Sequence, residues 1–175
     1  MEPTITLINT ALSSAKLIGG YSGYRFGRRK EDDMAVRRKL MIQLDTLRDH
    51  LINVMEDGDL DTRISSQKVI DVVDMFRNDI EIAETGHKYP FFSIQRSTSA
   101  GILKQLVKYD HQLISQLDSA IEATTVLEKA IAVGNMESGD AGLRTIKGFL
   151  STARGFFENR IAIIQKVEKV QKVKK

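Results

Sequence analysis

The chain has 175 residues, of which 26 are Lys or Arg and 23 are Asp or Glu, so its formal net charge is only +3. It contains no Cys, which excludes a disulfide framework, a thiol nucleophile and a thiolate zinc site, and which agrees with a reducing, cytoplasmic setting. Two prolines, no Trp and abundant Leu, Ile, Lys, Glu and Asp predict a mostly helical chain, and its length is enough to bury a core.

Residues 1–30 are the first predicted region, an amphipathic helix over about residues 4–19 followed by a flank of Gly, Arg and aromatic residues. Ile5, Ile8 and Leu12 share the apolar side of this helix, whereas its polar side is rich in Ser and Thr and nearly uncharged. That composition is typical of peripheral helices that insert into loosely packed lipid. The flank would add interfacial aromatic rings and cations, namely Tyr21, Tyr24, Arg25, Phe26, Arg28, Arg29 and Lys30.

Two other roles for this region stay open. The helix can dock on the rest of the protein, or the flank can contact nucleic acid, because aromatic rings stack on bases and cations meet phosphates. No stretch reaches the ~20 apolar residues that a membrane-spanning helix needs, and the N-terminus lacks the basic start of a signal peptide. We therefore expect a cytoplasmic protein that is soluble or peripheral at a membrane.

Helices are predicted next over about residues 31–55 and 62–85. The first begins with three acidic residues that suit the positive end of a helix dipole, and a seam of leucines follows between residues 40 and 51. Acidic residues around Gly58 end this helix, and Asp61 or Thr62 is expected to cap the next one. The apolar seam predicted for that helix is Val69, Val72, Phe76, Ile80 and Ala83.

The connection that follows is predicted to be a loop with an unusual aromatic content. Three of the four residues from 89 to 92 are aromatic, namely Tyr89, Phe91 and Phe92. An ordinary exposed loop is more polar than this. The loop is therefore expected either to cap the end of a helical bundle or to insert into a partner or a bilayer.

The last two predicted helices cover about residues 98–133 and 139–175, with Gly134 and Asn135 between them. The final helix has an inward row at steps of seven, beginning with Leu143 and Leu150. A second apolar row lies beside it, namely Phe149, Phe156, Ile163 and Val170. Since two adjacent rows imply two neighbouring helices, the second row predicts self-association into a homo-oligomer.

Charge is ordered along the chain. From residue 31 to 84 there are seven Lys and Arg against fourteen Asp and Glu, whereas from residue 143 to 175 there are nine against two. Helical surfaces of opposite sign that also carry apolar seams are expected to meet, either within one bundle or between copies.

Candidate catalytic chemistry is sparse. Glu81, Glu84 and His87 form one Glu-x-x-His spacing, but di-iron bundles use this spacing on two helices. The sequence has no phosphate-binding Gly-Lys-Ser/Thr loop, no Gly-x-Ser-x-Gly and no Cys/His pair. We expect no enzyme activity, no metal site, no cofactor and no small-molecule substrate.

Together these patterns predict an all-α fold, an antiparallel bundle of four long helices over residues 31–175 preceded by an N-terminal amphipathic helix. The predicted function is that of a self-associating structural or interaction protein that acts at a membrane surface. Its predicted partners are other copies of itself and anionic or loosely packed lipid. The alternative is a scaffold or coating protein that binds nucleic acid through the basic N-terminal flank and the lysine-rich C-terminal tail.

Overall fold

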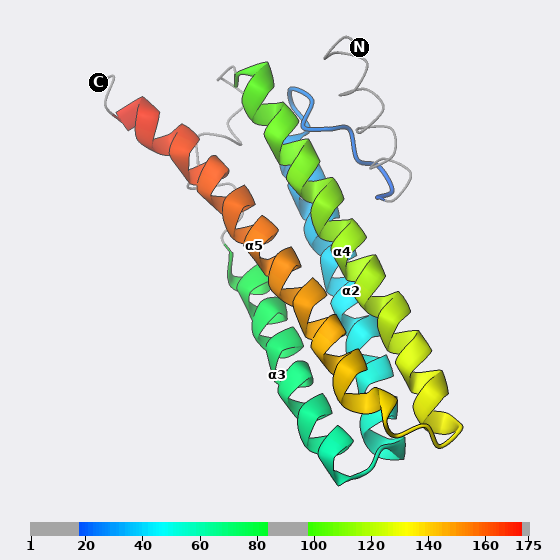
Figure 1. The fold of residues 1–175 in the computed structure, drawn as a ribbon. Helices are drawn as coiled ribbons and strands as arrows, with labels where there is room; N and C mark the ends of the chain where they lie inside the picture. The colour runs from blue at the N-terminus through cyan, green and yellow to red at the C-terminus, as the bar shows by residue number, and fades with distance from the viewer. Residues whose placement is uncertain (1–17, 84–97, 173–175) are drawn as a thin grey trace, which may run out of the picture. The chain divides into compact units, whose positions relative to one another are not determined.

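The computed structural model of the protein describes residues 18–83 and 98–172, with side chains described as far as residue 165. Within these residues the chain is helical and has no β-strand. Its helices are α2 (Arg29–Asp57), α3 (Leu60–Ile82), α4 (Ala100–Ala132) and α5 (Ser138–Lys172) (Figure 1). The four predicted long helices are confirmed, with ends within three residues of the prediction. The predicted helix over residues 4–19 lies outside the described residues, apart from residues 18 and 19 in a turn.

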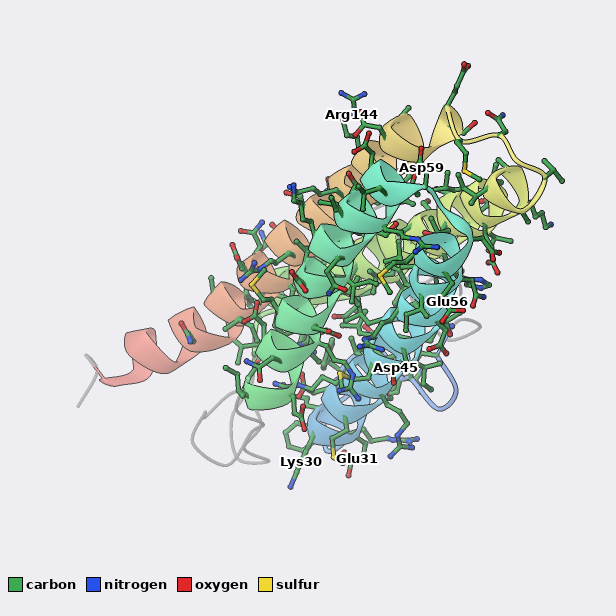
Figure 2. All side chains as sticks on the ribbon, turned by 90° about the horizontal axis from the view of Figure 1, so that it is seen from below. Lys30, Glu31, Asp45, Glu56, Asp59 and Arg144 are labelled. Atoms are coloured by element: carbon green, nitrogen blue, oxygen red, sulfur yellow. The ribbon has the colours of Figure 1, made fainter. Side chains whose placement is uncertain are left out.

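Local signals in the sequence explain two of the helix ends. Asp59 precedes α3 (Figure 2), and its Oδ1 accepts a hydrogen bond of 2.9 Å from the Thr62 amide. Asp59 is therefore the N-cap of α3. The predicted cap at Asp61 or Thr62 is wrong, because the helix already begins at Leu60 and the Asp59 carboxylate accepts from a free amide of its first turn. At the end of α4, Gly134 has a φ of 84°. Its amide bonds to the carbonyl of Ile131 at 2.8 Å while the next amide reaches back to Ala130, the Schellman arrangement that only a left-handed residue permits.

Contacts divide the chain into two compact units, and each is described separately below. Unit 1 comprises the described parts of Met1–Lys39, Ala83–Ile114 and Gly155–Lys175, and unit 2 comprises Leu40–Ile82 and Ser115–Arg154. Three of the four boundaries fall inside helices, so α2, α4 and α5 each contribute residues to both units, and the fourth lies at the end of α3. The predicted boundary at residue 30 falls within unit 1 and stays a prediction.

Unit 2 brings together segments of all four helices. Arg48 pairs with Asp74 at 2.9 Å and Arg77 with Asp45 at 2.8 Å, which joins α2 to α3. Gln43 donates to Asp118 at 2.6 Å, joining α2 to α4. Further contacts are Arg154 with Asp79, between α5 and α3, and Gly142 against Leu127, between α5 and α4. The neighbour order is α2, α3, α5, α4, which is that of a four-helix bundle.

The same contacts give the helix directions within unit 2. Residue numbers in α2 fall as their partners in α3 rise, from 48 with 74 to 45 with 77, so these helices are antiparallel. Numbers in α2 and α4 rise together, from 43 with 118 to 50 with 128, so these neighbours are parallel. The antiparallel expectation thus holds for the α2/α3 hairpin but not for every neighbour. Heptad patterns show which face is buried but not which helix covers it.

The core of unit 2 follows the predicted seams closely. The α2 seam of Leu40, Leu44, Leu47, Leu51 and Val54 is completely buried. In α3, Val73 is buried where Val72 was expected, because Val73 continues the steps of three and four that join the buried Ser66, Val69, Phe76 and Ile80. Acidic residues of α2 and α3 pair with arginines of α2, α3 and α5 inside the unit. Part of the charge ordering is therefore satisfied within one chain.

Candidate functional site

Residues 18–28, which precede α2, form the most irregular described segment. Gly20, Gly23 and Gly27 have φ values between 74° and 80°, and Tyr24 has a φ of 62°. Glycine adopts such angles without steric cost, whereas a tyrosine there costs on the order of 1–3 kcal/mol and persists only when its surroundings hold it. The contacts of Tyr24 should therefore explain the segment.

Asp32, in the first turn of α2, holds the backbone of this segment. Its Oδ1 accepts from the Ser22 amide at 2.8 Å, and its Oδ2 accepts from the Ser22 hydroxyl and the Tyr24 amide, both at 2.6 Å. The Asp32 side chain is completely buried. A carboxylate at a helix N-terminus is favoured by the helix dipole, and here it also satisfies donors of the preceding loop.

Arg160, from α5, lies at the centre of unit 1 and has no exposed surface. Its Nε donates to Asp110 Oδ1 at 2.7 Å, and its Nη2 donates to the Tyr24 hydroxyl at 2.7 Å and also to Asp33 Oδ1. Asp33 in turn pairs with Arg37 one helical turn further along α2, at 3.1 Å. A buried arginine of this kind is tolerated only when its charge and its donors are matched by partners.

Asp110, from α4, completes the arrangement. Its Oδ2 accepts from the hydroxyl of Tyr21 at 2.9 Å and from that of Tyr24 at 2.7 Å. The two rings also meet edge to face, with centroids 5.7 Å apart. We name these five residues, Tyr21, Tyr24, Asp33, Asp110 and Arg160, the Arg160 cluster. It joins the 18–28 segment to α2, α4 and α5 within unit 1.

Protonation in the Arg160 cluster supports these roles. Burial raises the pKa of Tyr24 well above its usual value, and burial together with the negative charge of Asp110 does the same for Tyr21. Burial also raises the pKa of Asp110, although Arg160 and the two tyrosine hydroxyls oppose this. Burial lowers the pKa of Arg160, but the acidic groups around it outweigh that effect and raise it well above its usual value. At neutral pH the tyrosines therefore remain hydrogen-bond donors and Arg160 remains a cation.

These positions change the interpretation of the predicted N-terminal contact residues. Tyr21 and Tyr24 are 5% and 0% exposed and Arg29 is 6% exposed, so their side chains do not reach the surface. A direct membrane or nucleic-acid contact does not fit this burial, because the hydroxyls of both tyrosines already bond to Asp110 and the two rings meet each other inside unit 1.

The remaining flank residues do lie at the surface. Phe26 is 67% exposed, and Arg25 and Arg28 on either side of it are exposed as well. Lys30 is partly exposed, and Figure 2 shows its side chain projecting from the first turn of α2 beside that of Glu31. We name residues 25–28 the Phe26 loop. A buried cluster on one side of the segment thus leaves one large aromatic ring and two cations in solvent on the other.

Other predicted contact residues give a mixed picture. Ile5, Ile8 and Leu12 fall outside the described residues, and so do the loop residues Tyr89, Phe91 and Phe92. In the second row of α5, Phe149, Phe156 and Ile163 are half-buried, and the Phe156 ring lies 6.0 Å from that of Tyr109 in α4. Val170 belongs to α5, but its side chain is not described. Self-association through this row stays a prediction.

Asp32, Asp33, Asp110 and Arg160 were not predicted from the sequence as site residues. A signal for two of them was present. Asp110 continues the buried α4 series of Leu106, Leu113 and Leu117, and Arg160 lies between Phe157 and Ile164 in the inward row of α5. A charge at an inward heptad position must find a partner of opposite sign, and these two are that pair.

Comparison with protein-family models, curated proteins and solved structures gives no match to this chain. Among residues 18–83 and 98–172, no three or more His, Asp or Glu side chains gather as metal ligands would. The helices in the described part of the chain are also not both long and apolar enough to cross a membrane.

Proposed function

We propose that the protein is a non-enzymatic interaction protein that binds anionic membrane surfaces peripherally, at the cytoplasmic side, through residues 1–30. The observation that carries this proposal is the exposure of Phe26 between Arg25 and Arg28 on a segment held by the Arg160 cluster. A large exposed aromatic ring beside cations is the combination that favours the boundary between headgroups and acyl chains.

Hydrogen bonds to Asp32 hold the backbone that precedes the Phe26 loop. A flexible loop would lose conformational entropy on binding, at ~1–2 kcal/mol per ordered residue for the backbone. Here Asp32 and the Arg160 cluster already order the backbone on the N-terminal side of the loop, and the Arg28 amide bonds to the carbonyl of Arg25 at 2.9 Å. The loop therefore loses less conformational entropy when it binds, so more of the contact energy contributes to affinity.

The size of the expected effect indicates that the loop does not act alone. Two arginines near an anionic surface contribute ~1 kcal/mol each, and burial of a Phe side chain contributes ~2 kcal/mol. The total of about 4 kcal/mol corresponds to a Kd of roughly 1 mM. Useful binding therefore needs a second contribution, for which we propose the amphipathic helix predicted over residues 4–19 and self-association of the bundle.

Nucleic acid is the competing ligand. Stacking on bases requires accessible aromatic faces, and two of the three aromatic residues predicted for that role, Tyr21 and Tyr24, are buried. Only Phe26 remains among the described flank aromatics. This difference favours the membrane, where one inserted ring and a small cationic patch already contribute.

Flotation with small vesicles tests the proposal. The protein should float with phosphatidylserine-containing vesicles and much less with phosphatidylcholine alone. Phe26→Ser and the double change Arg25→Gln/Arg28→Gln should each weaken binding roughly thirtyfold, since each removes ~2 kcal/mol. Matched controls on α4, Val126→Ser and Lys104→Gln/Lys129→Gln, also remove exposed groups and should leave binding unchanged.

Three outcomes would count against the proposal. These are failure of the wild-type protein to float, equal effects of the loop and control variants, or a shift of single-stranded RNA or DNA by a protein that ignores vesicles. Leu12→Asp serves as a further arm, since loss of binding in that variant with retention in Phe26→Ser would assign the contact to residues 4–19 alone.

A further inference from the structure

The solvent-facing side of α3 is unusually apolar for a helix in a small bundle. Four large apolar residues of this helix are each at least 48% exposed, namely Leu60, Ile64, Met75 and Ile82. Exposed single apolar residues are ordinary, but several aligned on one helix mark a contact surface. The buried residues of α3, from Thr62 to Ile80, lie on the opposite side of the helix.

Spacing makes the central part of this face a coiled-coil seam. Ile64, Lys68, Asp71 and Met75 follow one another at steps of four, three and four, and at 100° per residue they fall within about 60° of one another. All four are exposed. The ion pairs of α3 with α2 and α5, made by Asp74, Arg77 and Asp79, leave from the flanks of the helix and do not cover this seam.

We propose that this face of α3 binds the same face of a second copy, with the two α3 helices antiparallel. Reversing the direction of the seam places Ile64 of one copy opposite Met75 of the other, twice. It also places Lys68 opposite Asp71, twice, on the two sides of the symmetry axis. The seam is therefore complementary to itself in both shape and charge, as a two-fold interface requires.

Charge complementarity is what identifies the occupant and its direction. In a parallel pair the same residues would face themselves, so Lys68 would meet Lys68 and Asp71 would meet Asp71, which is unfavourable. The Asp71 carboxylate is also positioned by Gln67, whose Nε2 donates to it at 2.9 Å. An unrelated partner would have no reason to match this order of apolar, positive, negative and apolar groups.

This dimer goes beyond the proposed membrane binding and does not depend on it. It would place two Phe26 loops in one particle, which increases the avidity for a surface. The contact is small, and two helix faces bury less than the ~1,200 Å² of a standard interface. We therefore expect a weak dimer, with a Kd on the order of 100 µM.

Charge reversal tests the pairing. In sedimentation equilibrium, Lys68→Asp and Asp71→Lys should each weaken the dimer roughly tenfold, because each turns two attractive pairs into repulsive ones. The double variant Lys68→Asp/Asp71→Lys restores opposite charges and should dimerise like the wild type. Glu122→Lys and Lys129→Asp, at exposed positions of α4, are matched controls that should leave dimerisation unchanged.

Disulfide trapping tests the register in a chain that has no native Cys. With Ile64→Cys and Met75→Cys together, oxidation should give covalent dimers, since the two positions are eleven residues apart, ~16 Å along the helix, which prevents an internal bond. Ile64→Cys alone should cross-link poorly.

The proposal is overturned if the wild type stays monomeric at millimolar concentration, if the double charge variant does not recover dimerisation, or if Ile64→Cys alone cross-links as well as the pair. Vesicle flotation of Lys68→Asp and Asp71→Lys separates the dimer proposal from the membrane proposal. A variant that loses the dimer but still floats shows that the membrane contact at Phe26 does not require the dimer.

Discussion

Replacement of Arg160 by methionine should be one of the most damaging single changes in the described part of the protein. The side chain has no exposed surface and bonds to Asp110, Asp33 and the Tyr24 hydroxyl. Methionine fills much of the same volume but leaves the buried Asp110 without its cation and Asp33 with Arg37 alone. Breaking a buried pair in this way costs ~3–5 kcal/mol. Since a domain is stable by ~5–15 kcal/mol in total, a large part of the free energy of unfolding would be lost.

Urea unfolding followed by circular dichroism measures this loss as a fall in the extrapolated free energy. Arg144→Met is the matched control, because Arg144 also pairs with an aspartate but is 75% exposed, and its loss should cost under ~0.5 kcal/mol. Hydrogen exchange at the Tyr24 amide should accelerate in Arg160→Met, since the Arg160 cluster no longer holds residues 18–28. A loss below ~1 kcal/mol for Arg160→Met, or equal losses for both arginines, would refute the view that this cluster organises unit 1.

A double-mutant cycle isolates the pair. Arg160→Met and Asp110→Leu should together destabilise the protein less than the sum of the single changes, by ~1–3 kcal/mol, because the double variant leaves fewer buried charges unpaired. The wild type itself carries one offsetting cost, since Arg160 Nη1 is buried and has no hydrogen-bond partner among the described residues. Additive effects of the two changes would show that Arg160 and Asp110 do not act together.

Three smaller effects are expected elsewhere. Tyr21→Phe removes one hydroxyl donor to Asp110 and should cost ~1 kcal/mol of unfolding free energy, measured by urea unfolding; no loss would contradict this bond. The hydrogen bonds from Thr62 lower the pKa of Asp59, so its contribution is present above pH ~3.8 and is lost as pH falls through the lower folded value. The stability difference between wild type and Asp59→Asn should therefore shrink in acid, and a constant difference from pH 7 to pH 2 would oppose this assignment. Gly148 lies inside α5 with open space around it, so Gly148→Ala should add ~0.5–1 kcal/mol to the free energy of unfolding and raise the thermal midpoint. A decrease in the midpoint would mean that another helix packs there.

The helices of this protein were predictable because they depend on local and periodic signals. The α2 leucine seam and the stop at Gly134 follow from residues close in sequence. Which helices become neighbours could not be predicted in this way. The seventeen residues between Ile82 and Ala100 permit several arrangements, and only contacts such as Gln43 with Asp118 identify α4 as the parallel neighbour of α2.

The site was harder to predict for a different reason. The local composition around a tyrosine beside arginines is the same whether the ring is exposed or buried. Composition alone therefore places Tyr21 and Tyr24 at the surface. Their burial depends on Asp110 and Arg160, which lie more than eighty residues away in sequence. Asp110 and Arg160 occupy positions in otherwise apolar heptad seams. Such a position indicates that each charge has a buried partner, but it does not identify that partner.

The central claim is that the Arg160 cluster presents the Phe26 loop to an anionic membrane, and the fluorescence of a single tryptophan at residue 26 tests it most directly. The chain has no Trp of its own, so Phe26→Trp introduces one reporter at the proposed contact. On addition of phosphatidylserine-containing vesicles its emission should shift to shorter wavelength and be quenched by brominated acyl chains, with little change for phosphatidylcholine alone. Emission that stays unchanged while the protein floats with the vesicles would contradict the account, because binding would then occur without this loop.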